Sequence, residues 1–216
     1  MPRPPADQPL LTPDRITTAA LRMIDQDGAD ALSTRKLAAV LGVSSKAVYH
    51  YYATKDELLH AVYLSILDDL DLPEDSGGTW EEQLRRFAQS FRRLARRHPS
   101  FLTGFLGPHA PTARELDALD AFYTLLRRSG LPDALVLPTG QLLLTFLIGY
   151  LRAELGGTFQ GDTYRARVAA AARQRARYRT LPDLPVPAEG DDATFDLALD
   201  LLIASLRGGA AAPARS

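Results

Sequence analysis

The chain has 216 residues, of which 46% are hydrophobic and 24% charged, with 25 lysines and arginines against 26 aspartates and glutamates. The hydrophobic fraction excludes a disordered chain, and the length predicts one or two domains with a sizeable core. The net charge of -1 excludes a polybasic protein, so any contact with nucleic acid must come from a local basic patch. The absence of cysteine excludes disulfides, thiolate metal sites and thiol nucleophiles, and favours a reducing, cytoplasmic location.

No segment predicts secretion or a membrane partner. The beginning of the chain, MPRPPADQPLLTPD, lacks the apolar core of a signal peptide. The longest uncharged run, residues 134–151, is interrupted by Pro138, Gly140 and Gly149. Because about 20 predominantly apolar residues are needed to span a bilayer, we expect a buried core helix there and a soluble protein.

The first two helices are marked by the residues at their ends. Thr12 is a typical N-cap and Pro13 a typical first-turn residue. Apolar residues follow with a helical period until Gly28, which we expect to end the helix in the left-handed conformation. Ser33 predicts the start of a second, short helix, and Gly42 its end.

A third and a fourth helix follow closely. Ser44 or Ser45 caps the third, over about residues 46–51. The sequence Thr-Lys-Asp-Glu at 54–57 is a capping box, in which the threonine and glutamate side chains each accept a hydrogen bond from a free backbone N–H. The fourth helix is expected to bury four residues or their neighbours, Leu58, Val62, Ile66 and Leu70.

The sequence PEDSGG at 73–78 breaks the helical pattern and predicts two domains, 1–72 and 73–216. In the second domain we expect helices over 79–97, 101–106, 112–129, 136–155, 164–178 and 191–206, a proline-rich loop over 181–190, and a frayed tail from Gly208. No segment alternates as a β-strand does. The predicted fold class is all-α, with an N-terminal three-helix domain joined through a connecting helix to a C-terminal helical domain.

A local basic patch lies in residues 33–55, which contain no acidic residue. Its cations are Arg35, Lys36, Lys46 and Lys55. Two very short helices meet there around a glycine turn, with apolar residues placed to fill the angle between them. This spacing, over about residues 33–52, is typical of a helix-turn-helix, whose second helix enters the major groove of DNA.

The third helix is unusual for a helix that only faces water. Its exposed positions combine a lysine with tyrosines, serines and a histidine, which are side chains suited to base edges and phosphates. The alternative is a solvated three-helix bundle with half-packed tyrosines. Two tyrosines and a histidine on so short a helix favour DNA binding.

The sequence TRKLAAVLGVSSKAVYHYYATKDELL at 34–59 resembles the DNA-binding signature of the TetR family of bacterial transcriptional regulators. The similarity extends over roughly residues 12–70. It implies a homodimer that binds double-stranded operator DNA and leaves it when a small-molecule effector occupies the C-terminal domain.

The resemblance also implies roles for individual residues. Arg35 would contact a guanine, and Thr34, Tyr49 and Lys55 occupy positions that contact phosphates. The positions that face bases are Ser45, Lys46, Ala47, His50 and Tyr51. The full set of expected DNA-binding residues is Thr34, Arg35, Lys36, Ser44, Ser45, Lys46, Ala47, Tyr49, His50, Tyr51 and Lys55.

The C-terminal region resembles the tetracycline-repressor subclass through Trp80, the Ser-Phe-Arg-Arg run at 90–93 and the order of its helices. At aligned polar or metal-binding positions of that drug pocket this chain has Asp71, Phe87, Phe105, Pro108 and Phe122. Phe105 replaces the metal-liganding histidine. The resemblance therefore implies an apolar pocket and disfavours a magnesium–tetracycline complex.

Apolar and aromatic side chains could line such a pocket. The expected ligand-binding residues are Phe87, Phe91, Phe101, Phe105, Phe122, Leu126, Thr145 and Phe146. The alternative is that these residues form an ordinary close-packed core, because aromatic residues at helical spacing do so more often.

The long helix 136–155 and the last helix carry more apolar surface than a small domain can cover. Packing both helices against their copies in a twofold four-helix bundle would bury that surface. The expected interface residues are Leu142, Phe146, Leu199, Leu202, Ile203 and Leu206. The alternative is an internal helical hairpin of a monomer.

Arginines on helix 79–97 offer a possible second DNA surface, but a solvated face or pairing with acidic residues of another helix is expected instead. The six are Arg85, Arg86, Arg92, Arg93, Arg96 and Arg97. His98 and His109 have no spaced partner for a metal, so each is expected to be a surface or capping residue.

The interpretation is a ligand-responsive regulator, most consistent with a repressor, and not an enzyme. The chain has no P-loop, G-x-S-x-G, H-E-x-x-H or di-iron pattern. We assign no catalytic residue, no metal and no cofactor. The competing hypotheses are an all-α enzyme and a ligand-sensing protein without operator binding.

Overall fold

A computed structural model describes residues 10–73, 78–100, 102, 111–157, 162–175, 180 and 191–210. Within these residues every regular element is a helix, so the all-α expectation is confirmed. The chain divides into two compact units: a first unit of residues 1–70 and 93–115, and a second unit of residues 71–92 and 116–216. The sequence pattern gave no sign that residues 93–115 pack with the first unit, and the boundary at residue 72 stays a prediction.

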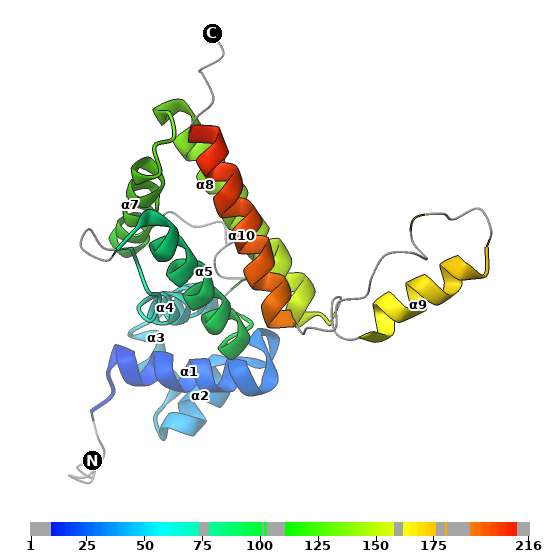
Figure 1. Ribbon diagram of the computed structural model, residues 1–216. Coiled ribbons are helices and arrows are strands. Elements are labelled where there is room, and N and C mark those ends of the chain that lie inside the picture. Colours follow the sequence, from blue (N-terminus) through cyan, green and yellow to red (C-terminus); the bar gives the residue numbers. More distant parts are fainter. Residues whose placement is uncertain are drawn as a thin grey trace, which may run out of the picture. The chain divides into compact units, whose positions relative to one another are not determined.

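The first unit begins with four α-helices, α1 (Pro13–Asp27), α2 (Thr34–Leu41), α3 (Ser45–Tyr49) and α4 (Lys55–Leu67), with a 3-10 turn at Ala29–Ala31 between the first two (Figure 1). Each α-helix has the cap that the sequence predicts. The side chains of Thr12, Ser33, Ser44 and Thr54 accept hydrogen bonds from backbone N–H groups of the first turn. These bonds satisfy donors that have no partner inside the helix.

Glycines end the first two helices, as expected, but in different conformations. Gly42 has φ +69° and ψ 27°, the left-handed conformation. Gly28 also has a positive φ, +84°, but its ψ of 160° lies outside the left-handed region, so that part of the prediction is wrong. The 3-10 turn starts immediately after Gly28.

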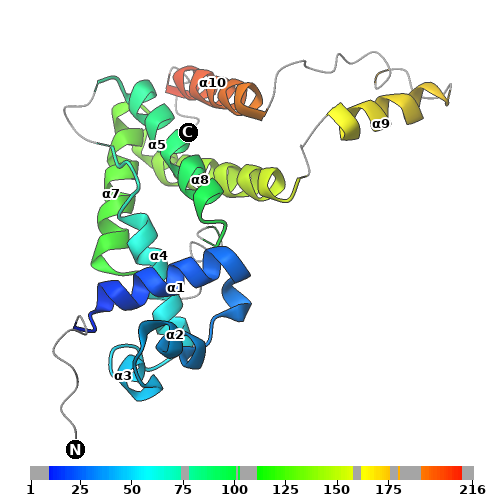
Figure 2. The same ribbon diagram turned by 90° about the horizontal axis from the view of Figure 1, so that it is seen from below.

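Buried aliphatic side chains hold α1 to α4 together. Ile16 and Ala20 of α1, Leu37 of α2 and Leu58 of α4 are almost fully buried. Val48 of α3 is buried. Ala38 is a small, buried residue of α2, the helix that packs against α3. Figure 2 shows α2 and α3 side by side, as a helix-turn-helix requires.

The helices that follow are α5 (Trp80–Arg97), α7 (Ala113–Arg128), α8 (Asp133–Leu155), α9 (Asp162–Arg173) and α10 (Asp191–Ala210). α5 and α7 are continuous helices that each contribute residues to both units. Several boundaries differ from expectation: α8 begins at Asp133, α9 ends at Arg173 rather than at residue 178, and α10 continues through Gly208 into the tail that we expected to be frayed. The expected helix over 101–106 lies outside the described residues, except for Leu102.

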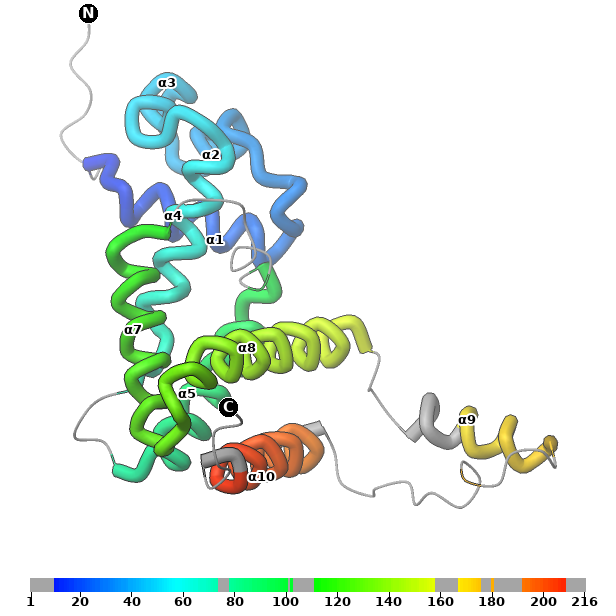
Figure 3. Tube along the Cα trace, turned by 90° about the horizontal axis from the view of Figure 1, so that it is seen from above, coloured from blue at the N-terminus to red at the C-terminus, as the bar shows by residue number. Residues whose placement is uncertain are grey.

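In the second unit α8 and α10 run antiparallel, as Figure 3 shows. α8 is long and apolar enough to cross a membrane by length and composition alone. The expectation of a buried core helix is correct for one face only. That face buries Leu143, Leu147 and Leu151, while Leu135, Leu137 and Leu142 are exposed.

A buried ion pair joins three helices of the second unit. The Arg92 guanidinium of α5 donates from Nε and Nη2 to the Glu154 carboxylate of α8, at 3.0 and 2.8 Å, and both residues are more than 90% buried. Its Nη1 lies 3.1 Å from Asp192 of α10, and its Cζ lies 4.4 Å from the centre of the Phe195 ring. Arg85 of α5 also pairs with Asp200 of α10, which confirms that arginines of this helix pair with acidic residues of other helices.

Gly140 is a close-approach position on α8. A Cβ atom at residue 140 would collide with the ring of Tyr123 on α7. Gly140→Ala is therefore expected to lower the free energy of unfolding by about 1–3 kcal/mol, because the ring and the helix must move apart. In a Tyr123→Ala background the same change should be neutral or stabilising, because alanine is the better helix former. Urea denaturation of the four proteins measures the difference, and equal effects in the two backgrounds would contradict the close approach.

Candidate nucleic-acid interface

The four cations of the basic patch are exposed on the helix-turn-helix and the start of α4. Arg35 and Lys36 lie in the first turn of α2, Lys46 lies on α3, and Lys55 is the first residue of α4. Of the other expected DNA-binding residues, Ser44, Tyr49, His50 and Tyr51 are exposed, and Thr34, Ser45 and Ala47 are half-buried. No acidic residue lies between Ala31 and Asp56, so the patch is not neutralised along the chain.

The position of α3 is fixed by the turn and by one buried side chain. The backbone N–H of Val43 donates to the carbonyl of Ala38 at 3.0 Å, which closes the turn around Gly42. Ser44 rather than Ser45 caps α3, with its hydroxyl 3.3 Å from the N–H of Ala47. Because Val48 is buried in the core of the first unit, the opposite side of α3 faces solvent.

The start of α4 is a capping box. The Thr54 hydroxyl accepts from the N–H of Glu57 at 3.1 Å, and the Glu57 carboxylate accepts from the N–H of Ala53 at 2.8 Å. The Ala53 amide is therefore occupied within the protein. This arrangement leaves the ammonium of Lys55 as the cation that this turn presents to a phosphate.

Tyr51 has a structural contact that the sequence did not predict. Its hydroxyl donates to the carbonyl of Leu11 at 2.8 Å, and its ring meets His50 edge-on with the ring centres 5.7 Å apart. The contact joins the residues before α1 to the residues that follow α3. The donor of Tyr51 is thus engaged, and the base-facing role expected for it stays a prediction that this geometry does not favour.

The aromatic residues expected to line a ligand pocket pack against one another. The Phe87 ring centre lies 6.2 Å from that of Phe91 and 5.0 Å from that of Phe122, and all three residues are buried, as is Leu126. Phe146 is half-buried beside Tyr150, and Thr145 is exposed. Phe101 and Phe105 lie outside the described residues. For the four buried residues the structure shows close packing, and their role in ligand binding stays a prediction.

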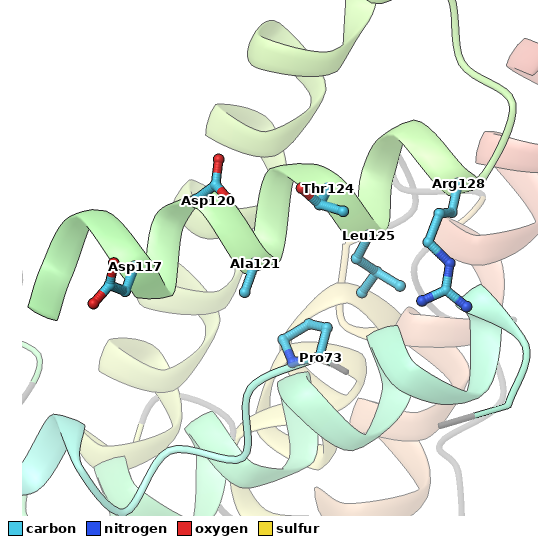
Figure 4. A pocket seen from close by; sticks show the side chains of 7 residues that line it. All are labelled: Pro73, Asp117, Asp120, Ala121, Thr124, Leu125 and Arg128. Atoms are coloured by element: carbon cyan, nitrogen blue, oxygen red, sulfur yellow. The ribbon is translucent and has the colours of Figure 1, made fainter. Parts of the chain in front are cut away.

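A pocket of about 340 Å³ lies elsewhere in the second unit (Figure 4). Its lining is Pro73, Asp117, Asp120, Ala121, Thr124, Leu125 and Arg128, none of which was expected to bind ligand. Asp117, Asp120 and Thr124 are exposed, and Arg128 is held by the side chain of Gln83 and the carbonyl of Gly78. It is a polar surface hollow rather than the apolar pocket that the sequence predicts.

Three residues expected in a dimer interface are buried within the protomer, namely Leu199, Ile203 and Leu206. These side chains expose little surface to a second copy, and the interface role expected for them stays a prediction that their burial does not favour. The exposed leucines of α10 are Leu197 and Leu201, at 59% and 64%. Leu142 of α8 is exposed as expected, while Phe146 and Leu202 are half-buried.

Sequence comparison matches both parts of the chain to known families. Residues 16–62 match the sequence model of bacterial regulatory proteins of the tetR family, and residues 72–208 match that of the tetracyclin repressor-like C-terminal domain. The second match alone covers more than half of the chain. The chain belongs to the TetR family. It is a TetR-family transcriptional regulator with a helix-turn-helix DNA-binding domain, and the fold and recognition predicted from sequence are confirmed.

Relatives of this TetR-family protein match over nearly the whole chain. An HTH-type transcriptional regulator of Saccharopolyspora erythraea is 32% identical over 208 residues, which cover 92% of this chain and 86% of the relative. The HTH-type transcriptional repressor DrrR1 of Streptomyces coeruleorubidus is 29% identical, over 94% and 83% of the two chains. The structure of the TetR-family protein ActR of Streptomyces coelicolor in complex with actinorhodin superposes with a TM-score of 0.79 and 27% identity, covering 94% of this chain and all of ActR.

Proposed function

We propose that the protein is a ligand-responsive repressor that binds a palindromic operator as a homodimer and releases it when a small, largely hydrophobic effector binds. The observation that carries the proposal is the exposed basic surface of α2, α3 and the start of α4, which contains four cations and no carboxylate over residues 33–55. Repressors among the relatives, such as DrrR1, support the direction of regulation.

Two of the four cations have different tasks in this proposal. Arg35 reads a base edge, since an arginine fork matches the two acceptors of guanine in the major groove. Lys55 lies at a helix start and binds phosphate, which contributes affinity for any sequence. The two roles predict different defects when each side chain is removed.

Lys55→Ala is expected to weaken binding about equally for all DNA sequences and to reduce the salt slope by about 1. Arg35→Ala is expected to cost about 1–3 kcal/mol and to relax specificity at one base pair in each half-site. Fluorescence anisotropy over a range of salt concentrations, with a duplex selected by the wild-type protein, measures both. Arg127→Ala is the matched control, because it removes an exposed arginine of the second unit that pairs with Asp133. Wild-type affinity in both Lys55→Ala and Arg35→Ala would contradict the proposed DNA-binding interface.

The proposed homodimer rests on the exposed apolar faces of α8 and α10. Leu197 and Leu201 lie one helical turn apart on α10, and Leu135 and Leu142 lie two turns apart on α8. Palindromic operators mirror the twofold symmetry of a dimer. The pairing of α8 and α10 with their copies would cover these leucines and place one recognition helix in each half-site.

The proposed effector is an uncharged, mainly apolar compound, such as an aromatic polyketide, that binds without a metal ion. The aromatic residues of α5 and α7 support an apolar site, because an apolar wall penalises an unpaired charge. The structure of the similar ActR in complex with actinorhodin supports a small organic molecule as the effector. In a screen of operator release and thermal shift we expect responses to uncharged, polycyclic aromatic compounds. Release by tetracycline that requires magnesium, or a response to polar anionic metabolites alone, would contradict this proposal.

The two alternatives keep separate tests. Among the described residues no group of three or more His, Asp or Glu could hold a metal ion, which gives an all-α metalloenzyme no support. A ligand sensor without operator binding would bind effector but show no sequence preference for DNA. We propose a regulator without enzymatic activity, and operator binding then requires a cytoplasmic location.

A further inference from the structure

The first unit contains a second segment of chain, residues 93–115, that returns to it from the second unit. The chain enters this segment within α5 and leaves it within α7, and both helices are continuous at the point of crossing. The chain therefore passes between the two units after α4, within α5 and within α7. The contacts that bind residues 93–115 to α1 and α4 decide whether those helices hold the helix-turn-helix in place.

One of these contacts joins the end of α5 to α1. The N–H of His98 donates to the carbonyl of Leu94 at 2.7 Å and so continues the helix. The imidazole Nδ1 lies 2.8 Å from Oδ2 of Asp25, and the two side chains are only 12% and 26% exposed. Because an ionised carboxylate only accepts hydrogen bonds, Nδ1 is the donor. The sequence suggested a surface or capping residue at His98. The structure shows instead a side chain that contacts Asp25 of α1.

Two further contacts join α7 to α4. The Glu115 carboxylate lies 3.4 Å from Nε2 of His60 and accepts from the N–H and hydroxyl of Thr112 at 2.8 and 2.9 Å. Burial, together with the charge of Glu115, raises the pKa of the neighbouring Tyr63 hydroxyl, so this tyrosine stays protonated. Arg114 and Asp68 lie 2.6 Å apart, but both side chains are about half exposed, and exposed pairs contribute little.

We propose that the His98–Asp25 contact is a positioning contact that sets the half-site spacing of the operator. α1 packs against both α2 and α4, so a fixed α1 fixes the helix-turn-helix. One base pair changes the separation of two half-sites by about 3.4 Å and rotates one about the other by about 35°. Strict spacing therefore requires that α3 of each protomer is held in a fixed orientation. The single chain connection after α4 does not by itself fix that orientation. This inference rests on the proposed operator-binding dimer.

The test uses the full-length protein and duplexes built from the half-sites that the wild type selects from a random library. Spacers between the half-sites range from two base pairs shorter to two base pairs longer than the selected length. For the wild type we expect about a tenfold loss of affinity for each base pair added or removed. For His98→Ala and for Asp25→Ala we expect a loss of about threefold or less per base pair, with unchanged binding to a single half-site at low salt.

Two variants separate positioning from general loss of structure. His98→Asn keeps an N–H donor near the place of Nδ1 and should restore the strict spacing. Asp27→Ala removes a nearby exposed carboxylate of α1 and should leave the spacing profile of the wild type. A variant that only loses folded protein would bind every spacer less well but keep the same profile.

Two outcomes would overturn the inference, and they differ from failure of the proposed function. One is a spacing profile in His98→Ala as narrow as that of the wild type. The other is a broadened profile in His98→Asn equal to that of His98→Ala. If the wild type selects no palindrome at all, the proposed operator-binding dimer fails, and the positioning contact fails with it.

Discussion

Glu154→Ala is expected to lower the free energy of unfolding by about 3 kcal/mol, since it leaves the buried guanidinium of Arg92 without its main partner. The pair is bidentate, and the two residues are 7% and 4% exposed. Asp192 remains within 3.1 Å of Arg92, but its side chain is 76% exposed and compensates only in part. Urea denaturation at a fixed protein concentration measures the change.

The matched comparison is the double replacement of Arg92 by methionine and Glu154 by leucine. Removing both charges and filling the space with apolar groups avoids an unpaired ion, so this protein should unfold much closer to the wild type. Arg127→Ala breaks an exposed pair and should change stability by about 0.5 kcal/mol or less. A Glu154→Ala protein within about 0.5 kcal/mol of the wild type would show that the pair does not hold α5 to α8.

The double variant Leu197→Glu and Leu201→Glu is expected to be monomeric at micromolar concentration and to lose operator affinity more than about a hundredfold. Both side chains are exposed in the protomer, so the protomer keeps its fold. In the proposed bundle the twofold axis would place four carboxylates in one apolar seam, where loss of solvent is costly.

Sedimentation velocity and anisotropy measure the two effects separately. Leu116→Glu is the control, because Leu116 is an exposed leucine of α7 that lies on neither α8 nor α10. The control should remain dimeric with wild-type affinity. An unchanged dimer in the Leu197 and Leu201 double variant would move the interface away from this face of α10.

The helix ends of the first unit could be predicted from sequence because they depend on neighbouring residues. An N-cap such as Ser33 or Thr54 acts on an amide three residues away, and Gly42 supplies its own positive φ. The helix-turn-helix was equally predictable, since its two helices and its turn occupy one short stretch. The exposure of Arg35, Lys46 and Lys55 follows from the same local pattern.

The contacts of the second unit depend on residues far apart in the chain, and periodicity alone could not assign them. α10 carries apolar residues on two sides, so the pattern did not show that Leu199 and Ile203 face the protomer while Leu197 and Leu201 face solvent. Arg92 is one of six arginines on α5, and only the packing of α8 makes it the buried one.

The return of residues 93–115 to the first unit was also beyond the sequence pattern. Nothing about His98 predicts its partner Asp25, which lies 73 residues earlier. A histidine and an aspartate are common surface residues, and their juxtaposition depends on the packing of α1 against the end of α5. The same holds for Tyr51, whose hydroxyl finds a backbone carbonyl 40 residues away.

The central claim is that α2 and α3 read a palindromic DNA sequence, and selection from a random duplex library tests it most directly. Wild-type protein and Arg35→Ala are each carried through the same rounds at fixed salt, and the enriched sequences are compared. The account predicts that the wild type enriches a palindrome whose half-site centres lie about 10 base pairs or a multiple of that apart. It also predicts that Arg35→Ala enriches the same palindrome with one base pair of each half-site relaxed. No enrichment by the wild type, or an identical motif in both proteins, would contradict it.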